Sequence, residues 1–466
     1  MFRSILEYKT PTLVLILHIA IGLGSLLTSW VSILWFYFIL LSNFGLLVQN
    51  QKPFYAIALV TYLTSFEILF RMVYATPYVP YEVGKYLLVG AFTIMIFTIS
   101  GRSVIGWLML VCILPALFYD YSGEVGFANL VFNAFGLVAL ALGVITCSTI
   151  SITLRELKTL LRLLVFPLIS CLTFIYIRTP DYEDITFDLG ANFETTGGFG
   201  SNQVSTILGL GCAIVFICII LKWQLTIVRW IDVGIFFLFG FQGLLTFSRG
   251  GVIGAVVAIV SFIYIISLSS DYIKKKYKVP NFLNYLIPLI FLGFFAFEIA
   301  NDITGGNLKL RYQGETAGTL VGAKEKDLNA LTSNRYNIFK EDLEVWQEFP
   351  ITGVGVGASR YMRNITEGII AHVELSRMLS EHGILGMFYF LLLIAVYFIY
   401  VNTTQQPVFK AIMTALFVLA LYSTFHAATR TYVTPMLVSI SVLRFKPDAT
   451  DTKPVNEQAV PVHQLH

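Results

Sequence analysis

The stretch from residue 127 to residue 149 reads FANLVFNAFGLVALALGVITCST and carries no charged side chain. An α-helix needs about 20 mostly apolar residues to cross a bilayer, and this stretch supplies them without interruption. Comparable runs lie at residues 11–29, 31–48, 54–74, 85–100, 103–119, 161–178, 204–222, 231–247, 251–268, 282–299, 384–401, 408–425 and 431–444. Because these runs are continuous rather than alternating, they exclude an outer-membrane β-barrel. The sequence therefore predicts an all-α, polytopic membrane helical bundle of about 12–14 transmembrane helices.

The overall composition supports this fold class. Of the 466 residues, 56% are hydrophobic and 13% are charged, whereas about 25% of the residues in ordinary soluble domains are charged. This balance excludes a soluble globular enzyme, a disordered chain and a nucleic-acid-binding protein. All five cysteines lie inside apolar runs, which predicts buried thiols rather than a disulfide framework or a thiolate metal site.

The basic residues indicate how the bundle is oriented. With a cytoplasmic N-terminus and alternating spans, the run Lys274-Lys275-Lys276-Tyr277-Lys278 falls in the cytoplasm, where positive charges gather beside spans. The short outer loops are acidic instead, as between Asp181 and Glu194. We therefore expect a multi-pass membrane protein with both termini in the cytoplasm. Its first apolar run is expected to be retained, because no small-residue cleavage site follows it.

One long polar segment interrupts the spans and falls on the outer side. Its sequence predicts an amphipathic helix that is capped by Ser333, has Ile338 and Trp346 on its apolar side and ends at Pro350. The glycines between 353 and 357 predict a turn, and a second helix is expected to begin near Ile369 and to continue into the next span. The chain is thus divided into N-terminal spans (1–299), an outer helical loop (300–383), C-terminal spans (384–446) and a disordered cytoplasmic tail (447–466).

Several charged side chains lie at the ends of spans on the outer face, where each is energetically costly. They are Glu67 and Arg71 in the third run, Arg249 and Arg430 between later runs, and the cluster His372, Glu374, Arg377, Glu381 and His382. The spacing 374, 377 and 381 places Glu, Arg and Glu on one helix face. Arginines from separate places above an apolar bundle predict an anion site, because a guanidinium group binds two phosphate oxygens and stays charged. A pyrophosphate with a lipid tail in the bundle fits such a site.

Each of these residues also has a purely structural interpretation. Glu67 and Arg71 could form an internal ion pair, and Arg377 could be neutralised by its two neighbouring glutamates. Arg249 could reach the lipid headgroups, and a single histidine at a membrane surface often only packs.

Motifs for metal or nucleotide chemistry are absent from the sequence. It has no HExxH motif, no metal-ligand spacing of Cys and His, and no Walker A lysine. The run Gly353-Val-Gly355-Val-Gly357 has the wrong spacing for a dinucleotide site. We therefore expect no bound metal and no cofactor.

Four motifs occur in a particular order, and together they resemble a known family. They are GGFGSNQVS at 197–205, TFSRGG at 246–251, PITGVGVG at 350–357 and HVELSRMLSEHGILG at 372–386, with Ser333-x-Arg335 before the third. This set resembles the O-antigen ligase and O-antigen polymerase superfamily of bacterial envelope glycosyltransferases. The resemblance is strongest from about residue 197 to residue 390.

The resemblance implies a bacterial inner-membrane enzyme with a periplasmic active face. Its donor would be a glycan on undecaprenyl pyrophosphate, and its acceptor would be the lipid A core, a growing polysaccharide or a protein hydroxyl. Membrane lipids would surround it, and transfer would be metal-independent and inverting. On this reading, His372 activates the acceptor hydroxyl and Arg249 binds pyrophosphate, with Arg71, Arg335, Arg377 and Arg430 as further candidates.

Some questions stay open at the level of sequence. The residues after His372 depart from the family pattern, so Glu374 or Glu381 could share the role of base, or His382 could replace His372. Ligase and polymerase are not distinguished. A transporter or flippase of lipid-linked sugars is the main alternative, and a non-catalytic scaffold is another. Proximity of Arg71, Arg249, His372 and Arg377 would favour the enzyme.

Overall fold

The computed structural model describes residues 11–48, 52–99, 102–277, 282–323, 325–332 and 335–448. In these ranges the chain forms helices joined by turns and loops, with one pair of two-residue parallel strands, β1 (Ser151–Ile152) and β2 (Arg444–Phe445). The predicted all-α class is confirmed. All five cysteines are buried and free, as expected from their apolar surroundings.

The longer helices in chain order are α2 (Pro11–Leu27), α3 (Trp30–Asn43), α4 (Pro53–Thr64), α5 (Glu67–Met72), α6 (Val83–Thr98), α7 (Val104–Ile113), α8 (Phe127–Cys147), α9 (Leu154–Arg178), α10 (Ser201–Ile220), α11 (Arg229–Leu245), α12 (Arg249–Ser267), α13 (Asp271–Tyr277), α14 (Phe282–Ile303), α18 (Arg335–Glu348), α20 (Glu374–Val396), α21 (Pro407–His426) and α22 (Val433–Ser441). The shorter ones are η1 (Phe44–Val48), η2 (Pro115–Leu117), η3 (Tyr182–Asp184), η4 (Glu194–Thr196), α15 (Asn307–Tyr312), α16 (Ala317–Leu320), α17 (Leu328–Leu331), α19 (Ser359–Met362) and η5 (Tyr397–Val401).

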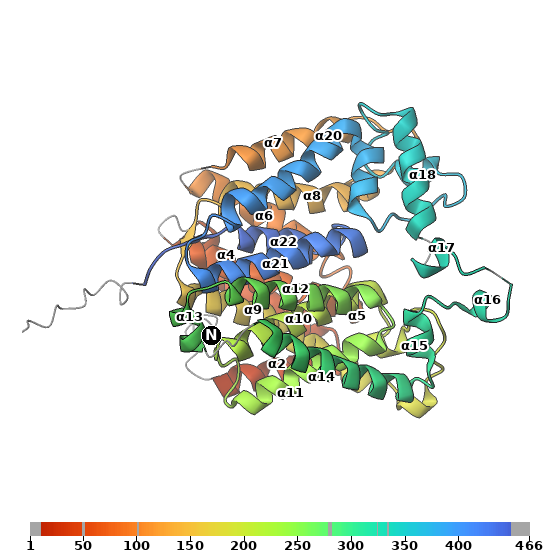
Figure 1. Cartoon of the computed structure of the whole chain (residues 1–466). Helices are drawn as coiled ribbons and strands as arrows, with labels where there is room; N and C mark the ends of the chain where they lie inside the picture. The colour runs from red at the N-terminus through yellow and green to blue at the C-terminus, as the bar shows by residue number, and fades with distance from the viewer. Residues whose placement is uncertain are drawn as a thin grey trace, which may run out of the picture.

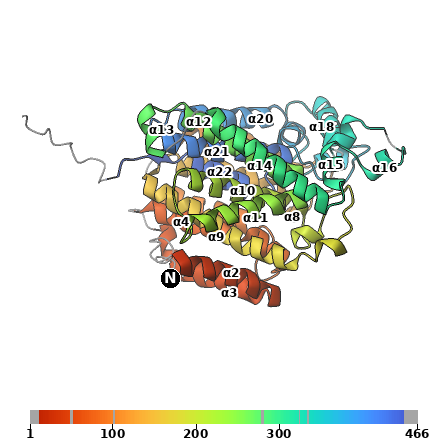
Figure 2. The ribbon, with the colours of Figure 1, turned by 60° about the horizontal axis from the view of Figure 1, so that its bottom comes forward.

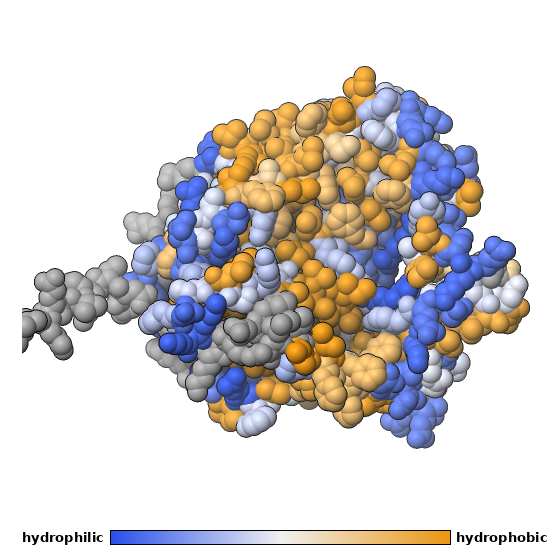
Figure 3. All heavy atoms as spheres, in the orientation of Figure 1, coloured by the Kyte–Doolittle hydropathy of each residue, from blue (hydrophilic) through white to orange (hydrophobic). Residues whose placement is uncertain are grey.

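The long helices lie roughly side by side and form one bundle (Figure 1). Within the described residues, eight helical stretches are long and apolar enough to cross a membrane, and three shorter apolar helices accompany them. Figure 3 shows the consequence on one face: an apolar band around the middle, with hydrophilic residues at both ends. One end, which we call the α18 end, carries α15–α18, and the opposite end carries α13 (Figures 1 and 2).

The last predicted span, 431–444, is not one continuous helix. It contains α22, which is nine residues long, and all nine are buried. At 1.5 Å per residue such a helix reaches less than half way across a bilayer. The residues before it, from Ala427 to Tyr432, are non-helical, and all but Arg430 are buried. Irregular backbone at such a depth is tolerated where protein surrounds it.

The segment between α14 and α20 is helical, as expected, but two details differ or lie out of reach. Helix α18 is present and Pro350 follows it, and the glycines at 353–357 form turns. The predicted cap Ser333 lies outside the described residues. The second helix begins at Glu374 rather than near Ile369, because side chains of α18 hold the preceding backbone in an extended loop. Residues 449–466 of the predicted tail also lie outside the described part.

Candidate functional site

A polar cavity of about 370 Å³ opens at the α18 end of the bundle. Three arginines from three elements line it: Arg249 is the first residue of α12, Arg311 belongs to α15, and Arg335 is the first described residue of α18. The remaining lining residues are Ala191, Asn202, Phe247, Ser248, Gly250, Ile253, Leu331, Thr332, Tyr336, Phe339, Val373, Tyr422 and Phe425. In Figure 3 the surface is hollowed between the bundle and the projecting segment that carries α15–α17. The arrangement concentrates positive charge at one polar opening above an apolar bundle.

The position of Arg249 follows from the two glycines after it. A Cβ atom at Gly250 would overlap the ring of His426 on α21, and one at Gly251 would overlap the backbone carbonyl of Ser205 on α10. Small residues let membrane helices approach this closely. The Arg-Gly-Gly sequence thus places the start of α12 tightly between α10 and α21, with the arginine at the cavity.

Arg249 also connects the bundle to the outer segment. Its Nη1 donates to the carbonyl oxygen of Arg311 at 3.3 Å, and its Nη2 donates to that of Leu331 at 2.5 Å. Both carbonyls lie in the last turns of short helices, where backbone oxygens lack intrahelical partners. One guanidinium group therefore holds α15 and α17 beside the start of α12.

Arg335 is bound to a histidine rather than to a carboxylate. Its Nη1 lies 3.3 Å from Nδ1 of His426, and no ion pair to it occurs among the described residues. Burial lowers the pKa of Arg335 from its ordinary value, but an arginine stays protonated at neutral pH. It therefore brings an uncompensated positive charge to the cavity wall.

His372 lies next to Val373, which lines the cavity. Burial, together with the positive charges of Arg430 and Arg335, lowers the pKa of His372 to about 3. The imidazole is therefore neutral at physiological pH. Its Nδ1 is buried and has no hydrogen-bond partner among the described residues.

An apolar groove of about 790 Å³ runs along α12. It lies between α10, α11, α12 and α14, and Val252, Val256 and Ile259 contribute to it from α12. Because α12 also supplies Arg249 and Ile253 to the polar cavity, both spaces share this helix. A charged headgroup and an apolar chain could thus be held along one helix.

The cavity arginines lie in a stretch that is similar to a known protein family. Residues 233–391 match the family model described as O-antigen ligase. Over this range the chain is similar to O-antigen ligases. The matched range contains Arg249, Arg311, Arg335 and His372, and it ends inside α20. The resemblance predicted from the motifs is confirmed, and the apolar helices together with this match indicate an integral membrane protein. No curated protein matches the chain.

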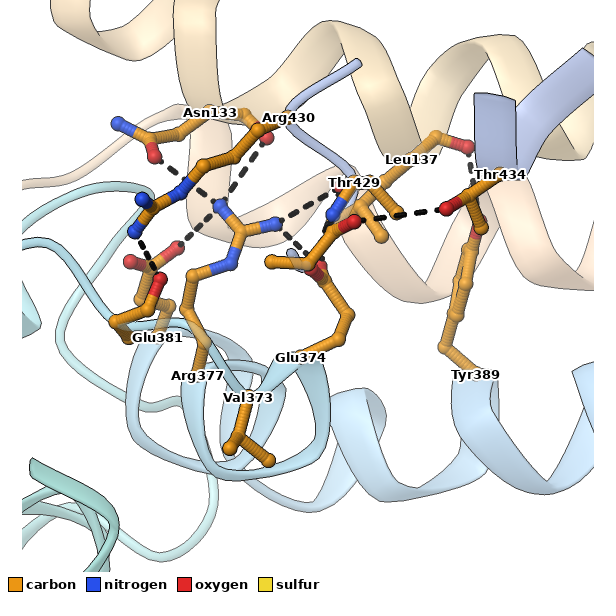
Figure 4. A network of polar contacts seen from close by, with 12 residues as sticks. Asn133, Leu137, Val373, Glu374, Arg377, Glu381, Tyr389, Thr429, Arg430 and Thr434 are labelled. Atoms are coloured by element: carbon orange, nitrogen blue, oxygen red, sulfur yellow. Dashed lines mark hydrogen bonds and ion pairs between the residues drawn. The ribbon is translucent and has the colours of Figure 1, made fainter. Parts of the chain in front are cut away.

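Within the matched range, Arg377 has a different setting from the cavity arginines (Figure 4). Its guanidinium group is buried and pairs with Glu374 and, at 3.8 Å, with Glu381. It also donates to Asn133 Oδ1 at 3.1 Å and to Thr429 Oγ1 at 3.3 Å. The predicted one-face arrangement of Glu, Arg and Glu is confirmed. These three side chains form one ion-paired cluster, which binds α8 and the loop before α22.

Arg71 lies in a second buried network, outside the matched range. It forms an ion pair with Glu67 at 2.8 Å and with Glu82 at 3.1 Å, and Glu82 pairs in turn with Lys85. A further hydrogen bond joins Arg71 to Gln203 on α10. The network contains two carboxylates and two cations, so it is electrically balanced without a ligand.

Arg430 and His382 have more limited contacts. Arg430 donates to the carbonyl oxygen of Ala371, next to His372, and it lies beside the Arg377 cluster (Figure 4). His382 is buried in α20, and neither ring nitrogen has a hydrogen-bond partner in the described part. The structure thus brings Arg249 and Arg335 to one cavity and places His372 next to its lining residue Val373, while Arg71 and Arg377 lie in separate ion-pair networks.

Side chains of α18 hold the loop that carries His372. The carboxylate of Glu341 accepts backbone N–H groups from Asn364 at 3.0 Å, Ile365 at 2.6 Å and Thr366 at 2.9 Å. The neighbouring Asp342 pairs with Arg363 at 3.3 Å, and Arg363 donates to the carbonyl oxygen of Ile369 at 2.7 Å. Helix α18 therefore carries Arg335 at one end and fixes the His372 loop from its middle.

Three residues of this region were not predicted from the sequence. Arg311 lies in the polar segment among other basic residues, and nothing local distinguishes it. Asn202 stood inside the motif at 197–205 and His426 directly follows the run 408–425, but the place of Asn202 at the cavity and of His426 beside Gly250 depends on how α10, α12 and α21 pack. A search for polar residues at span ends would have found His426.

Proposed function

We propose that this protein transfers a glycan from undecaprenyl pyrophosphate to an acceptor hydroxyl on the periplasmic face of the bacterial inner membrane. The observation that carries the proposal is the meeting of Arg249, Arg311 and Arg335 at one cavity beside the neutral His372. On this proposal the α18 end is periplasmic and both termini are cytoplasmic. The similarity to O-antigen ligases supports the reaction class.

The donor would bind through both of its chemically different parts. The pyrophosphate would lie in the polar cavity, because guanidinium groups bind phosphate oxygens in pairs and remain charged. The polyprenyl chain would lie in the apolar groove along α12, whose walls are supplied by α10, α11 and α14. A ligand that needs both environments at once is a lipid-linked anion.

The transfer would be a single displacement at the anomeric carbon. The acceptor oxygen forms the new bond to that carbon, and the bond from the carbon to the phosphate oxygen breaks with its electron pair. On this proposal the acceptor's proton passes to Nδ1 of His372, which has no hydrogen-bond partner among the described residues. The arginines stabilise the negative charge that develops on the departing pyrophosphate, the kind of preorganised electrostatic help that often dominates catalysis. Displacement from the opposite side inverts the anomeric configuration.

The other candidate residues would act indirectly. We assign Arg377, Glu374 and Glu381 to a structural cluster, because each is already paired in it. Arg71 belongs to a balanced network of its own. Arg430 would support the His372 loop through the carbonyl of Ala371. His382 has no polar route to the cavity and is assigned to packing.

Complementation of a gene deletion tests the proposal and separates the possible acceptors. Wild type, Arg335→Ala, His372→Ala and the control Lys340→Ala are compared by electrophoresis of envelope glycans. Lys340 lies on α18 with Arg335 but is exposed, and within the described part of the chain its ion pair is with Glu344 at 3.7 Å. Single repeat units on the lipid core would identify a polymerase, and full chains on the carrier with bare core would identify a ligase. Both variants should fail to complement, whereas Lys340→Ala should succeed.

Two results would contradict the proposal. An unchanged glycan pattern in the deletion strain would instead favour transport of lipid-linked sugars. Normal complementation by both Arg335→Ala and His372→Ala would exclude this cavity as the site.

A further inference from the structure

Three polar side chains connect the starts of α10 and α12 at the edge of the arginine-lined cavity. Ser205 Oγ donates to Ser248 Oγ at 2.8 Å and also lies 3.1 Å from the backbone carbonyl oxygen of Asn202, and Ser248 Oγ donates to Asn202 Oδ1 at 2.9 Å. Asn202 and Ser248 both line the cavity, whereas Ser205 is fully buried. The chain of donors therefore runs from the helix interface outward and ends at Asn202.

The hydrogen bond between Ser248 and Asn202 has one possible direction. Oδ1 of Asn202 can only accept, so Ser248 Oγ supplies the proton. The amide oxygen of Asn202 is the acceptor, and its nitrogen carries two N–H donors. No hydrogen bond from this nitrogen occurs within the described part of the chain. Two neutral donors are thus left at the cavity beside Arg249.

We infer that Asn202 is a further ligand-binding residue, which donates hydrogen bonds from its side-chain amide to a phosphate oxygen of the donor. The inference rests on the proposed function, because it takes a pyrophosphate as the cavity's ligand. The three arginines already supply positive charge there. A neutral amide adds donors without adding repulsion among the cations. It also has a fixed direction, since Ser248 holds its oxygen.

A purely structural role for Asn202 makes the opposite prediction. If Asn202 served only to accept the Ser248 hydrogen bond, a carboxylate at this position would accept it equally well. Asn202→Asp would then be milder than Asn202→Ala. If the amide instead faces a phosphate, the new carboxylate would lie against an anion of like charge. Asn202→Asp would then be worse than Asn202→Ala.

The test measures binding of undecaprenyl pyrophosphate without a glycan to the full-length protein in lipid nanodiscs. Loss of a hydrogen bond to a charged group typically costs about tenfold to a hundredfold in affinity. We expect Asn202→Ala to weaken binding by about tenfold and Asn202→Asp to weaken it by at least about tenfold more. Asn202→Asp that binds as well as Asn202→Ala, or better, would overturn the inference.

Two further variants keep the result interpretable. Ser248→Ala removes the same Ser248–Asn202 hydrogen bond but leaves the amide donors, so we expect it to weaken binding less than about threefold. An effect equal to that of Asn202→Ala would support the structural role and overturn the inference, even if Asn202→Asp failed to fold.

Arg335→Ala reports on the proposed function itself. If it leaves binding unchanged, the cavity is not the pyrophosphate site; if it abolishes binding while both Asn202 variants bind normally, only the present inference fails.

Discussion

Nη1 of Arg335 lies 3.3 Å from Nδ1 of His426, and this contact determines the protonation of the histidine. A guanidinium group only donates hydrogen bonds, so Nδ1 must be the acceptor and the proton of the neutral ring must be on Nε2. His426 also packs against Gly250, immediately after Arg249. One imidazole ring therefore orients one cavity arginine and packs beside another.

The first prediction concerns His426. His426→Phe keeps a planar ring beside Gly250 but removes the acceptor for Arg335. We expect the KM for the lipid-linked donor to rise by about tenfold, the usual cost of a lost charge-assisted hydrogen bond. Steady-state kinetics in proteoliposomes measure it, with Lys410→Ala at the other end of α21 as the control. An unchanged KM would mean that Arg335 does not depend on His426.

The second prediction concerns Glu341, which accepts three backbone N–H groups of the His372 loop. Glu341→Ala should release this loop and lower kcat by about tenfold or more, because a general base contributes about 10²–10⁴-fold only when it is positioned. KM for the donor should change little, since the arginines are untouched. Glu341→Gln keeps one acceptor oxygen and should restore part of kcat.

The matched control for Glu341 is Glu344 on the same helix. Glu344 is exposed, and within the described part of the chain its ion pair is with Lys340 at 3.7 Å, so Glu344→Ala should behave like wild type. Equal kcat values for Glu341→Ala and Glu344→Ala would show that the loop does not need this carboxylate.

The apolar part of the fold was predictable from the sequence because bilayer thickness sets the length of each run. The site was predictable only in part. The possible ion pair of Arg71 with Glu67 was visible in the sequence from their spacing, and it is present in the structure. The second partner of Arg71, Glu82, lies eleven residues after it and faces it only in the folded chain. Arg311 and Asn202 reach the cavity through helix packing that no local pattern encodes.

The third prediction tests the close packing that places Arg249. A Cβ atom at Gly251 would overlap the carbonyl of Ser205, so Gly251→Ala must push α10 and α12 apart. Overpacking of this kind typically costs about 1–3 kcal/mol, and we expect a lower unfolding temperature together with reduced activity. Gly234→Ala on α11 is the control, because its Cβ would meet no atom within 4 Å. If both variants unfold at the wild-type temperature, the packing is looser than the structure indicates.

The fourth prediction separates structural arginines from binding arginines. Arg377→Ala leaves Glu374 and Glu381 buried without their cation, and breaking a buried pair in this way typically costs about 3–5 kcal/mol. We expect a large loss of thermal stability. Arg335→Ala, in contrast, should keep the unfolding temperature and lose donor binding. Fluorescence-monitored unfolding in detergent measures the first effect. Full stability of Arg377→Ala would return this arginine to the candidates for ligand binding.

The fifth prediction follows from the lowered pKa of His372. Its pKa is about 3 in the folded protein, against an ordinary value of 6.5, so the unfolded chain binds this proton more readily. The contribution of the neutral His372 side chain to the free energy of unfolding is therefore fully present above about pH 6.5. It is lost as the pH falls toward about 3. His372→Asn cannot be protonated, so the wild type should lose stability relative to this variant between about pH 6.5 and about pH 5. Unfolding temperatures of both proteins, measured across this range in one detergent, give the comparison. A constant difference between them would mean that His372 keeps an ordinary pKa and is not enclosed by the cavity's positive charges.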